Sequence, residues 1–405
     1  MHIDLYSARS FAAGHPVDQY AYLRENAPCH WQETPNGSGY WALTRYEDVN
    51  RVGRDTGTFS SEPTVMIDDS GPDGLDLPTE HRMMLMMDPP DHTAYRKLVS
   101  REFLPKRSQA MAVRMSNLAR QIVDEVIERG ECDFVTDIAG EMPSYVIAEM
   151  LGLPLDDGRK LYELTEVIHT AREALPEGAQ SRAIADMFAY AQNLISERRG
   201  KPGEDLASIL LNAEVDGKRL EDMEFCLFFM LLIDAGGDTT RNLVAGGMLE
   251  LLGRPAVLAD LRGDLDGLLP TARDELLRWI SPVVHFRRRA KRDTVVAGQE
   301  VQAGERVVVY YGAANRDPRV FDDPERLDIT RSPNPHLAFG SGAHICLGQH
   351  LAKVEIDTLL REVLTRMQDL ELAGEPTRLA SNFICGPTSM PVTFRQAARS
   401  DGPGH

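Results

Sequence analysis

The sequence predicts a mainly α-helical fold with a small β region, and three observations support this prediction. Residues 110–199 carry apolar positions at intervals of three and four, with breaks at Gly130, at residues 152–154 and at residues 176–178. Residues 220–252 continue the same period over a length that predicts one long helix. Short strand-like runs bounded by turn residues appear near both ends of the chain.

The N-terminal sixty residues combine short helices with one hairpin. Residues 18–24 have the spacing of a short helix, and residues 46–52 predict another. Residues 30–32 and 40–44 flank Pro35-Asn36-Gly37, which is a strong hairpin signal. We expect a small sheet here, packed beside the helical body.

We expect a single domain over residues 1–405, because no internal repeat or low-complexity linker divides the chain. Residues 301–304 and 307–310 are strand-like and predict a second hairpin-like pair. The β-rich parts are expected at about 25–60, 290–330 and 380–395, and the helical body at about 90–280 and 346–370.

Composition excludes several classes of partner. The chain carries a net charge of −18, which repels nucleic acid phosphates and anionic lipids. Its five cysteines are widely spaced and odd in number, which favours a reducing compartment over a disulfide framework. The longest apolar run, residues 225–233, is too short to span a membrane, and the N-terminus lacks signal-peptide features. We expect a cytoplasmic protein without a membrane anchor.

Residues 62–80 are rich in Pro, Gly, Asp and Ser and show no periodicity. A loop of this length in a compact domain is usually functional or disordered. A run of methionines follows, and their adaptable side chains either fill the core or border an apolar pocket. These are Met83, Met84, Met86 and Met87.

A cysteine in a glycine-rich loop marks the centre of the expected chemistry. Residues 339–348 contain Cys346, and a helical pattern follows at once. The helix N-terminus favours a thiolate over a thiol. Gly340, Gly342 and Gly348 permit unusual dihedral angles and let a bulky planar group approach the backbone. One sulfur presented in this way fits a thiolate ligand of haem iron.

Two alternatives remain for this loop from its residues alone. Cys346 can be a buried structural cysteine. It can also form a zinc site with His344 and His350, although this set lacks a paired Cys-x-x-Cys or His-x-x-x-His motif.

The loop resembles the haem-ligand signature of the cytochrome P450 family, Phe-Gly-x-Gly-x-His-x-Cys-x-Gly, at every fixed position. This resemblance implies the cytochrome P450 fold and haem b (iron protoporphyrin IX) bound through the thiolate of Cys346. Phe339, Gly340 and Gly348 then belong to the cofactor-binding loop. The resemblance runs from about residue 30 to residue 395.

Four residues are expected to hold the haem propionates. His92 and Arg96 are four residues apart, so they share one helix face, which is otherwise typical of a solvated surface. The resemblance extends to this motif and implies the propionate role for both. Residues 286–292 are the most basic stretch and could alone be a nucleic-acid or partner patch. The resemblance favours Arg288 as a propionate ligand, with its neighbours 287 and 289 pointing away, and His344 as the other partner.

The centre of the long helix contains residues that disfavour helix formation. Gly236 and Gly237 are adjacent, each costs about 1 kcal/mol against alanine, and an acid follows. A Gly-capped helix end is the alternative, but helical residues resume after residue 242. We expect a local opening of the helix. The match to the family's Ala/Gly-Gly-x-Asp/Glu-Thr pattern implies that Ala235 adjoins the cofactor, that Asp238 relays protons and that Thr239 donates to bound oxygen.

A Glu-x-x-Arg motif supplies a structural element. Glu275 and Arg278 lie three apart on a helix, which alone usually indicates a surface ion pair. The resemblance implies that this pair binds an arginine of a later irregular segment. Arg326 is the expected third member.

No polar anchor for a substrate is evident in the sequence. The family's geometry implies a mostly apolar set of pocket residues, and therefore a hydrophobic small-molecule substrate. The residues around 381–392 resemble actinobacterial enzymes that act on sterol side chains and methyl-branched lipids; a terpenoid, fatty acid or secondary-metabolite scaffold is the rival. The expected pocket residues are Leu232, Ala235, Val283, Val284, Ile384 and Cys385.

Electrons must come from outside, because the chain shows no flavin or iron–sulfur motif. The resemblance implies a ferredoxin and a ferredoxin reductase as partners. A local basic patch near Cys346 would receive the ferredoxin, unless these residues are ordinary solvated helix faces. The patch residues are Lys97, Arg101, Lys106, Arg107 and Lys353.

The resemblance implies a haem-thiolate monooxygenase that uses dioxygen and two electrons to hydroxylate its substrate. One alternative is an enzyme that uses peroxide or catalyses a rearrangement, against which the intact Asp238-Thr239 pair argues. A tailoring enzyme of a secondary-metabolite pathway is a second alternative. A haem-based binding or sensor protein is the third.

Overall fold

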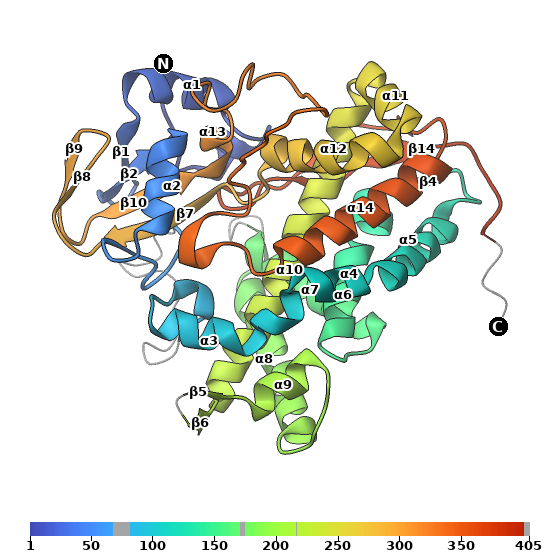
Figure 1. Cartoon of the computed structure of the whole chain (residues 1–405), viewed down its shortest axis with the longest axis horizontal. Coiled ribbons are helices and arrows are strands. Elements are labelled where there is room, and N and C mark those ends of the chain that lie inside the picture. Colours follow the sequence, from blue (N-terminus) through green and yellow to red (C-terminus); the bar gives the residue numbers. More distant parts are fainter. Residues whose placement is uncertain (68–81, 171–174, 216, 401–405) are drawn as a thin grey trace.

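A large helical body and a smaller sheet region lie side by side in the molecule (Figure 1). The computed structural model describes residues 1–67, 82–170, 175–215 and 217–400. Most of the Pro- and Gly-rich segment 62–80 lies outside the described residues.

The helical body follows the periodicity of the sequence. The gaps between helices from α5 to α8 fall at the three breaks predicted within residues 110–199. The α-helices are α1 (Val17–Asn26), α2 (Tyr46–Arg54), α3 (Asp91–Val99), α4 (Pro105–Ala110), α5 (Ala112–Val126), α6 (Glu141–Met150), α7 (Leu155–His169), α8 (Ala179–Arg198), α9 (Leu206–Asn212), α10 (Asp222–Leu252), α11 (Pro255–Gly263), α12 (Leu265–Ile280), α13 (Tyr311–Ala314) and α14 (Gln349–Arg366). Shorter turns of other helix types occur at Ala8–Phe11, Met84–Met86, Ser100–Phe103, Val135–Ala139 and Gly342–His344.

Helix α10 passes through the centre of the molecule, with α14 crossing beside it (Figure 1). Its N-terminus is closed by a capping box between Glu221 and Glu224. The helix is continuous through its glycine pair, so the predicted local opening is wrong. Gly237 serves close packing instead, because a Cβ there would lie 2.7 Å from the ring of Tyr162 in α7. Only a glycine lets α7 approach α10 this closely. Gly236, in contrast, lines a cavity, and a Cβ on it would lie 3.6 Å from Ile147.

The main sheet joins residues far apart in the sequence. Its five strands have the order β1 (Cys29–Glu33), β2 (Gly39–Leu43), β10 (Arg306–Tyr310), β7 (His285–Ala290) and β3 (Phe59–Ser60). Strands β1 and β2 form the predicted hairpin, with Trp31 opposite Trp41. Strand β10 runs parallel to β2 and antiparallel to β7.

The second predicted hairpin is wrong. Strand β10 lies at the centre of the main sheet, where its buried valines are covered on both sides. The strand before it, β9 (Gln299–Val301), pairs with β8 (Thr294–Val296) instead. The remaining strands are β4 (Glu131–Asp133), β5 (Glu214–Val215), β6 (Lys218–Arg219), β11 (Glu371–Leu372), β12 (Thr377–Arg378), β13 (Pro387–Ser389) and β14 (Pro391–Thr393).

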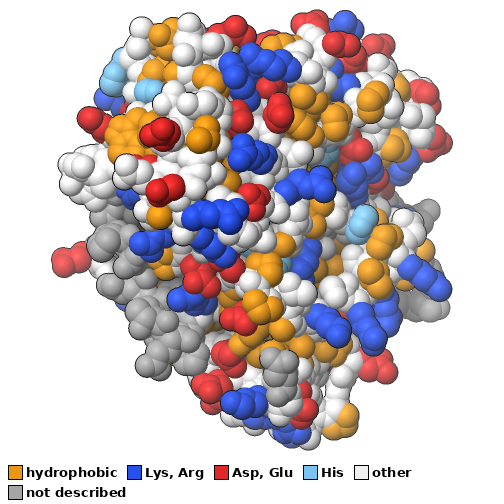
Figure 2. Space-filling view, turned by 60° about the vertical axis from the view of Figure 1, so that its left-hand side comes forward, with side chains coloured by type: hydrophobic (Ala, Val, Ile, Leu, Met, Phe, Trp, Pro, Cys, Tyr) orange, Lys and Arg blue, Asp and Glu red, His pale blue; other side chains and the backbone are white. Residues whose placement is uncertain are grey.

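The largest hydrophobic core lies among α5, α6, α10 and α14, and α5 packs along α14 (Figure 1). Met83, Met84 and Met86 belong to this core. Over one face of the molecule, charged side chains of both signs are interspersed with hydrophobic ones (Figure 2). Among the residues described, no helix has the length and apolarity needed to cross a membrane.

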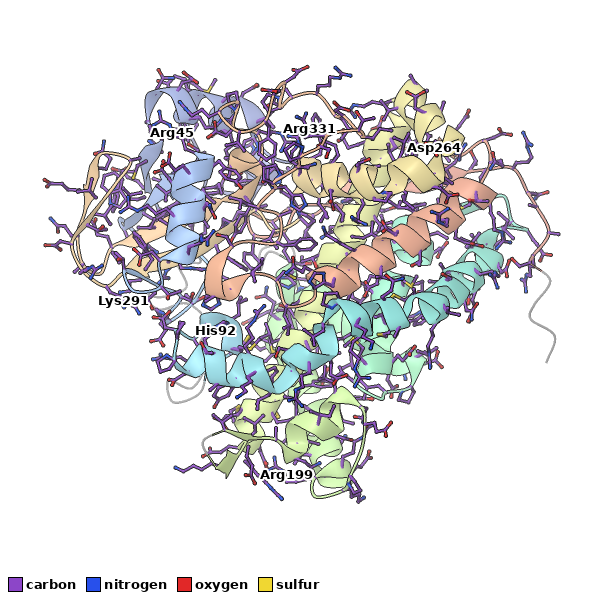
Figure 3. All side chains as sticks on the ribbon, in the orientation of Figure 1. Arg45, His92, Arg199, Asp264, Lys291 and Arg331 are labelled. Carbon is purple, nitrogen blue, oxygen red and sulfur yellow. The ribbon has the colours of Figure 1, made fainter. Side chains whose placement is uncertain are left out.

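A buried ion-pair cluster joins α12 to the segment before α14. Glu275 and Arg278 are fully buried, with 2.8 Å between Glu275 Oε1 and Arg278 Nη2. The third member is Arg331 (labelled in Figure 3), whose Nε lies 3.1 Å from Glu275 Oε2. The prediction of Arg326 is wrong, because that exposed residue contributes its carbonyl oxygen, 3.3 Å from Arg278 Nη2. Asn334 also donates to Glu275.

Replacing Arg331 by alanine is expected to lower the free energy of unfolding by about 1.5–3 kcal/mol, because it removes a hydrogen bond between charged groups. Arg326→Ala is the matched control and should change it by less than about 0.5 kcal/mol, since its side chain is exposed. Denaturant unfolding of the haem-loaded protein, followed by circular dichroism, measures both. Equal losses in the two variants would contradict the assignment.

Candidate active site

A cavity lies between the Cys346 loop and α10, with α3 and the start of α14 along its sides. Together with its open mouth it encloses about 1450 Å³ of space outside protein atoms. Cys346 lines it on one side, and Ala235 and Thr239 line it from α10.

The Cys346 loop is held in shape by backbone contacts. The N–H of Cys346 donates to the carbonyl of Phe339, at 2.8 Å. Gly342 has φ +72°, and a Cβ there would lie 2.6 Å from the carbonyl oxygen of Gly53 in α2. Both conditions require glycine. The loop therefore packs directly on the helix that covers the sheet.

Of the two roles predicted for Gly348, an unusual dihedral angle and an open approach to the backbone, the first is wrong. Its φ is −83°, which any residue adopts, so it does not supply an unusual dihedral angle. A Cβ there would meet no described atom within 4 Å, and the residue lines the cavity. The glycine keeps this part of the cavity wall flat.

Cys346 lies two residues before Gly348, the N-cap of α14, as the sequence predicts. Burial raises the pKa of its thiol, whereas the backbone N–H groups of Gly348 and Gln349 and the charge of Arg96 lower it. The net direction is upward, contrary to the sequence-based expectation of a thiolate. A bound metal ion would reverse this balance, since coordination deprotonates a thiol.

Four basic side chains gather at one edge of the cavity. The rings of His92 and His344 have centroids 4.1 Å apart. Arg96 donates to the carbonyl of Ile345, at 2.7 Å. Arg288 is buried on β7 and follows Phe286 on the same face, with its guanidinium 5.6 Å from that ring. All four predicted propionate ligands therefore converge.

The electrostatics of this edge favour added anions. Burial, and then the charge of a neighbouring arginine, lowers the pKa of His92 to about 4 and that of His344 to about 3. Nδ1 of His92 is buried without a hydrogen-bond partner among the described residues, whereas Nε2 of His344 lies 3.1 Å from Ser61 Oγ. The nearby carboxylate of Asp88 is paired with Lys291, at 2.8 Å (His92 and Lys291 are labelled in Figure 3).

These residues fit haem b. Cys346 presents one sulfur to the cavity, Gly348 leaves its wall flat, and the basic edge offers charge-assisted donors to two carboxylates. The zinc alternative fails, because His344, Cys346 and His350 do not form a metal-binding group in the described part of the chain. The structural-cysteine alternative fails because Cys346 faces the cavity.

Helix α10 presents its two predicted catalytic residues in different directions. Thr239 faces the cavity, and its hydroxyl donates to the carbonyl of Ala235, at 3.1 Å. Asp238 is 1% exposed and points toward α7. Neighbouring residues on a helix point about 100° apart, so the two cannot share one face.

Asp238 lies in a group of charges that the sequence reasoning did not identify. Its Oδ1 is 3.3 Å from Arg241 Nη2, and its Oδ2 is 3.8 Å from His169 Nε2. His169 pairs with Asp234, and Arg241 pairs with Glu166. The only sequence signal for this group was the four-residue spacing of Asp234 and Asp238, which places both on one helix face.

The pKa values of this group are strongly displaced. Burial raises the pKa of Asp238 to about 6, against the opposing charge of His169. Burial lowers the pKa of His169, but the charges of Asp234 and Asp238 outweigh it and raise the value to about 9. This group therefore holds exchangeable protons close to the cavity.

The pocket prediction is half right. Leu232, Ala235 and Val283 line the cavity. The prediction fails for three neighbours, which are buried beside the cavity rather than in its wall. Val284 and Cys385 pack with the N-terminal segment, since successive residues of an extended strand face opposite sides. Ile384 pairs with Val283 through a β-bridge.

Other wall residues were missed because they come from helices without a pocket signal. Val146 and Ile147 of α6 and Leu243 of α10 add apolar surface, and Met84 confirms that the methionine run borders the cavity as well as the core. Glu355 of α14 also lines the cavity, and burial raises its pKa to about 8.

Comparisons with known proteins agree with this geometry. Residues 177–375 match the family model for cytochrome P450. A cytochrome P450 of Mycobacterium tuberculosis is 38% identical over 404 residues, covering 97% of each chain. The methyl-branched lipid omega-hydroxylase of Mycobacterium bovis is 38% identical over 93% of this chain and 90% of its own. The steroid C26-monooxygenase of Rhodococcus jostii is 34% identical, over 95% and 83% respectively.

Solved structures show the same fold. A Mycobacterium marinum cytochrome P450 in complex with pseudoionone has a TM-score of 0.90 and 36% identity, covering 97% of this chain and 99% of its own. A Bacillus megaterium cytochrome P450 in complex with corticosterone has a TM-score of 0.80 and 31% identity, covering 94% and 98%.

Replacing Arg288 by glutamine is expected to accelerate haem loss about tenfold to a hundredfold, because a charge-assisted hydrogen bond worth ~1.5–3 kcal/mol is removed. Arg289→Gln is the matched control, since that side chain is exposed on the same strand. Transfer of haem to excess apomyoglobin gives both rates. Faster loss from Arg289→Gln than from Arg288→Gln would show that the assignment is wrong by one residue.

Proposed function

The chain belongs to the cytochrome P450 monooxygenases, and on this premise we propose that it hydroxylates a hydrophobic small molecule, namely a sterol, terpenoid or branched lipid. Haem b, bound through Cys346, supplies the redox chemistry that activates dioxygen and oxidises a C–H bond. The observation that carries the proposal is the apolar wall opposite Cys346. Two relatives support the proposal: one is named a methyl-branched lipid omega-hydroxylase and the other a steroid C26-monooxygenase.

The apolar wall supplies binding by area rather than by hydrogen bonds. Leu232 of α10, Val283 of the segment between α12 and β7, and Phe286 of β7 line the cavity, and Val146 and Ile147 of α6 extend this surface. Each buried Val, Leu or Phe side chain contributes roughly 1.5–3 kcal/mol when it loses contact with water. A bulky apolar substrate would therefore bind by excluding water from the space above the thiolate ligand.

Thr239 and Asp238 are proposed to deliver protons to the cavity. Thr239 is the hydroxyl at the cavity wall, but it has to turn away from the carbonyl of Ala235 before it can donate into the cavity. Asp238 sits one residue earlier, on the side that faces His169. Its pKa of about 6 suits a group that takes up and releases a proton near neutral pH. In this proposal the threonine hydroxyl is the last donor, and the aspartate reloads it.

We also propose a ferredoxin, reduced by a ferredoxin reductase, as the electron donor. Lys97, Arg101, Lys106 and Arg107 are exposed on neighbouring segments from α3 to α4, and α4 packs against α14 beside the Cys346 loop. This local positive patch could attract an acidic protein despite the net charge of −18. Lys353 contributes less, since it is paired with Asp274 at 3.1 Å.

An optical titration tests the substrate class. We expect a 3-keto sterol to shift the Soret band of the haem-loaded protein toward the high-spin form, because a ligand that fills the apolar cavity would exclude water from it. A methyl-branched fatty acid and a terpenoid ketone are titrated in parallel. If only the fatty acid or only the terpenoid ketone produces the shift, the substrate is a branched lipid or a terpenoid rather than a sterol. If none of the three produces a shift, the proposed substrate class is wrong.

Thr239→Ala is expected to keep haem binding but to lower the yield of product per NAD(P)H consumed by about tenfold or more, with hydrogen peroxide formed instead. Thr239→Ser keeps the hydroxyl and should restore the yield. The measurement is the ratio of product to NAD(P)H with a ferredoxin and its reductase. An unchanged ratio in Thr239→Ala would exclude the proton-donor role.

A further inference from the structure

A histidine and two aspartates meet between α7 and α10, outside the cavity wall. His169 is the last residue of α7, and Asp234 and Asp238 are four residues apart on one face of α10. His169 Nε2 and one carboxylate oxygen from each aspartate all lie within 4.8 Å of one another. Nitrogen and oxygen donors of this kind bind divalent transition metals.

Asp238 is the most deeply buried member of this group, and its charged neighbours are Arg241 at 3.3 Å and His169 at 3.8 Å. Its side chain is 1% exposed, and neither carboxylate oxygen has a hydrogen-bond partner among the described residues. The nearby guanidinium of Arg241 is held by Glu166 and lies 5.1 Å from the ring centre of Tyr162. These ion pairs leave the hydrogen-bonding capacity of the buried carboxylate unused, so it can still accept a further ligand.

The local charge also calls for a cation. Glu166 and Asp238 both pair with the guanidinium of Arg241, and Asp234 pairs with the imidazole of His169, so this group has three carboxylates and one arginine. Two negative charges are therefore uncompensated when the imidazole of His169 is neutral, which is the form that coordinates metals. A divalent cation would balance both charges.

The site is accessible to an ion from solvent, and the ring of His169 is held in a fixed orientation. The side chain of Asp234 is 27% exposed, whereas those of His169 and Asp238 are 6% and 1% exposed. Among the described residues, the site therefore reaches solvent at Asp234. The ring of His169 stacks on Phe383 with 5.9 Å between ring centres, which fixes the direction of its nitrogen.

We propose that His169, Asp234 and Asp238 form a binding site for a divalent transition metal, with Zn²⁺ as the best fit. One imidazole nitrogen and two carboxylate oxygens would occupy three tetrahedral positions, and water entering beside Asp234 would take the fourth. Tetrahedral ligands at zinc distances are roughly 3.3 Å apart. His169 Nε2 and Asp238 Oδ2 are 3.8 Å apart, and all three donor atoms lie within 4.8 Å of one another, so side-chain rotations would have to bring them to these distances.

Occupation of this site would have two consequences. The ion would link α7 to α10, because its ligands come from both helices. It would also occupy the carboxylate of Asp238 and so reduce turnover. That second consequence rests on the relay role proposed for Asp238, whereas zinc binding itself does not.

Isothermal titration of the haem-loaded protein with Zn²⁺ tests the site. The wild type should bind one ion at this site, and His169→Gln and Asp234→Asn should each weaken that binding by at least about tenfold. His30→Gln is the matched control, since His30 lies on β1 in the sheet region, and should bind as the wild type does. Mg²⁺ should compete poorly, because it demands octahedral oxygen ligands.

A second measurement keeps the test independent of folding defects. The Soret band reports whether each variant holds haem, and Zn²⁺ should raise the unfolding temperature of the wild type but not that of Asp234→Asn. Wild-type protein that binds no zinc would overturn the proposal. Binding that survives in both His169→Gln and Asp234→Asn would overturn it as well, since the ion would then sit elsewhere.

Discussion

The position of the Cys346 sulfur depends on contacts with both regions of the molecule, the sheet region and the helical body. Cys346 is held by its backbone bond to Phe339 and by the close approach of Gly342 to Gly53. The second contact belongs to α2, which covers the sheet, whereas Cys346 itself leads into α14 in the helical body. The loop thus joins the two regions. Because the cavity lies between this loop and α10, a shift of either region would move the sulfur relative to the opposite wall.

The opposite wall depends on a packing constraint of its own. A Cβ on Gly237 would collide with Tyr162, so this glycine lets α7 pack against α10, and the helix stays continuous. This close approach buries Asp238 and places His169 beside it. The same sequence that costs helix propensity therefore creates the charged group behind the cavity.

Sequence reasoning succeeded where the signal was local. The long helix, the first hairpin and the Cys346 loop follow from periodicity, turn chemistry and a compact motif, and the four basic residues at the cavity edge converge as expected. Sequence-based prediction failed where a contact depends on the path of an irregular segment. Arg331 rather than Arg326 reaches Glu275 because the chain turns back between them, and no periodic pattern records that turn. Val284 and Cys385 were misplaced because one residue of register reverses the face of a strand.

Helix α10 carries the residues that line the cavity on one face and charged side chains on the other. Leu232, Ala235 and Thr239 follow one face into the cavity, and Asp234, Asp238 and Arg241 follow the other toward α7. Such an arrangement keeps charges out of a cavity built for an apolar ligand while holding a titratable carboxylate one residue away from it. In the proposed relay, a proton could pass between the two faces only after Thr239 rotates, because its hydroxyl donates to the carbonyl of Ala235 in this structure. The helix is therefore both the wall that excludes water from the cavity and the support that positions Asp238 beside it.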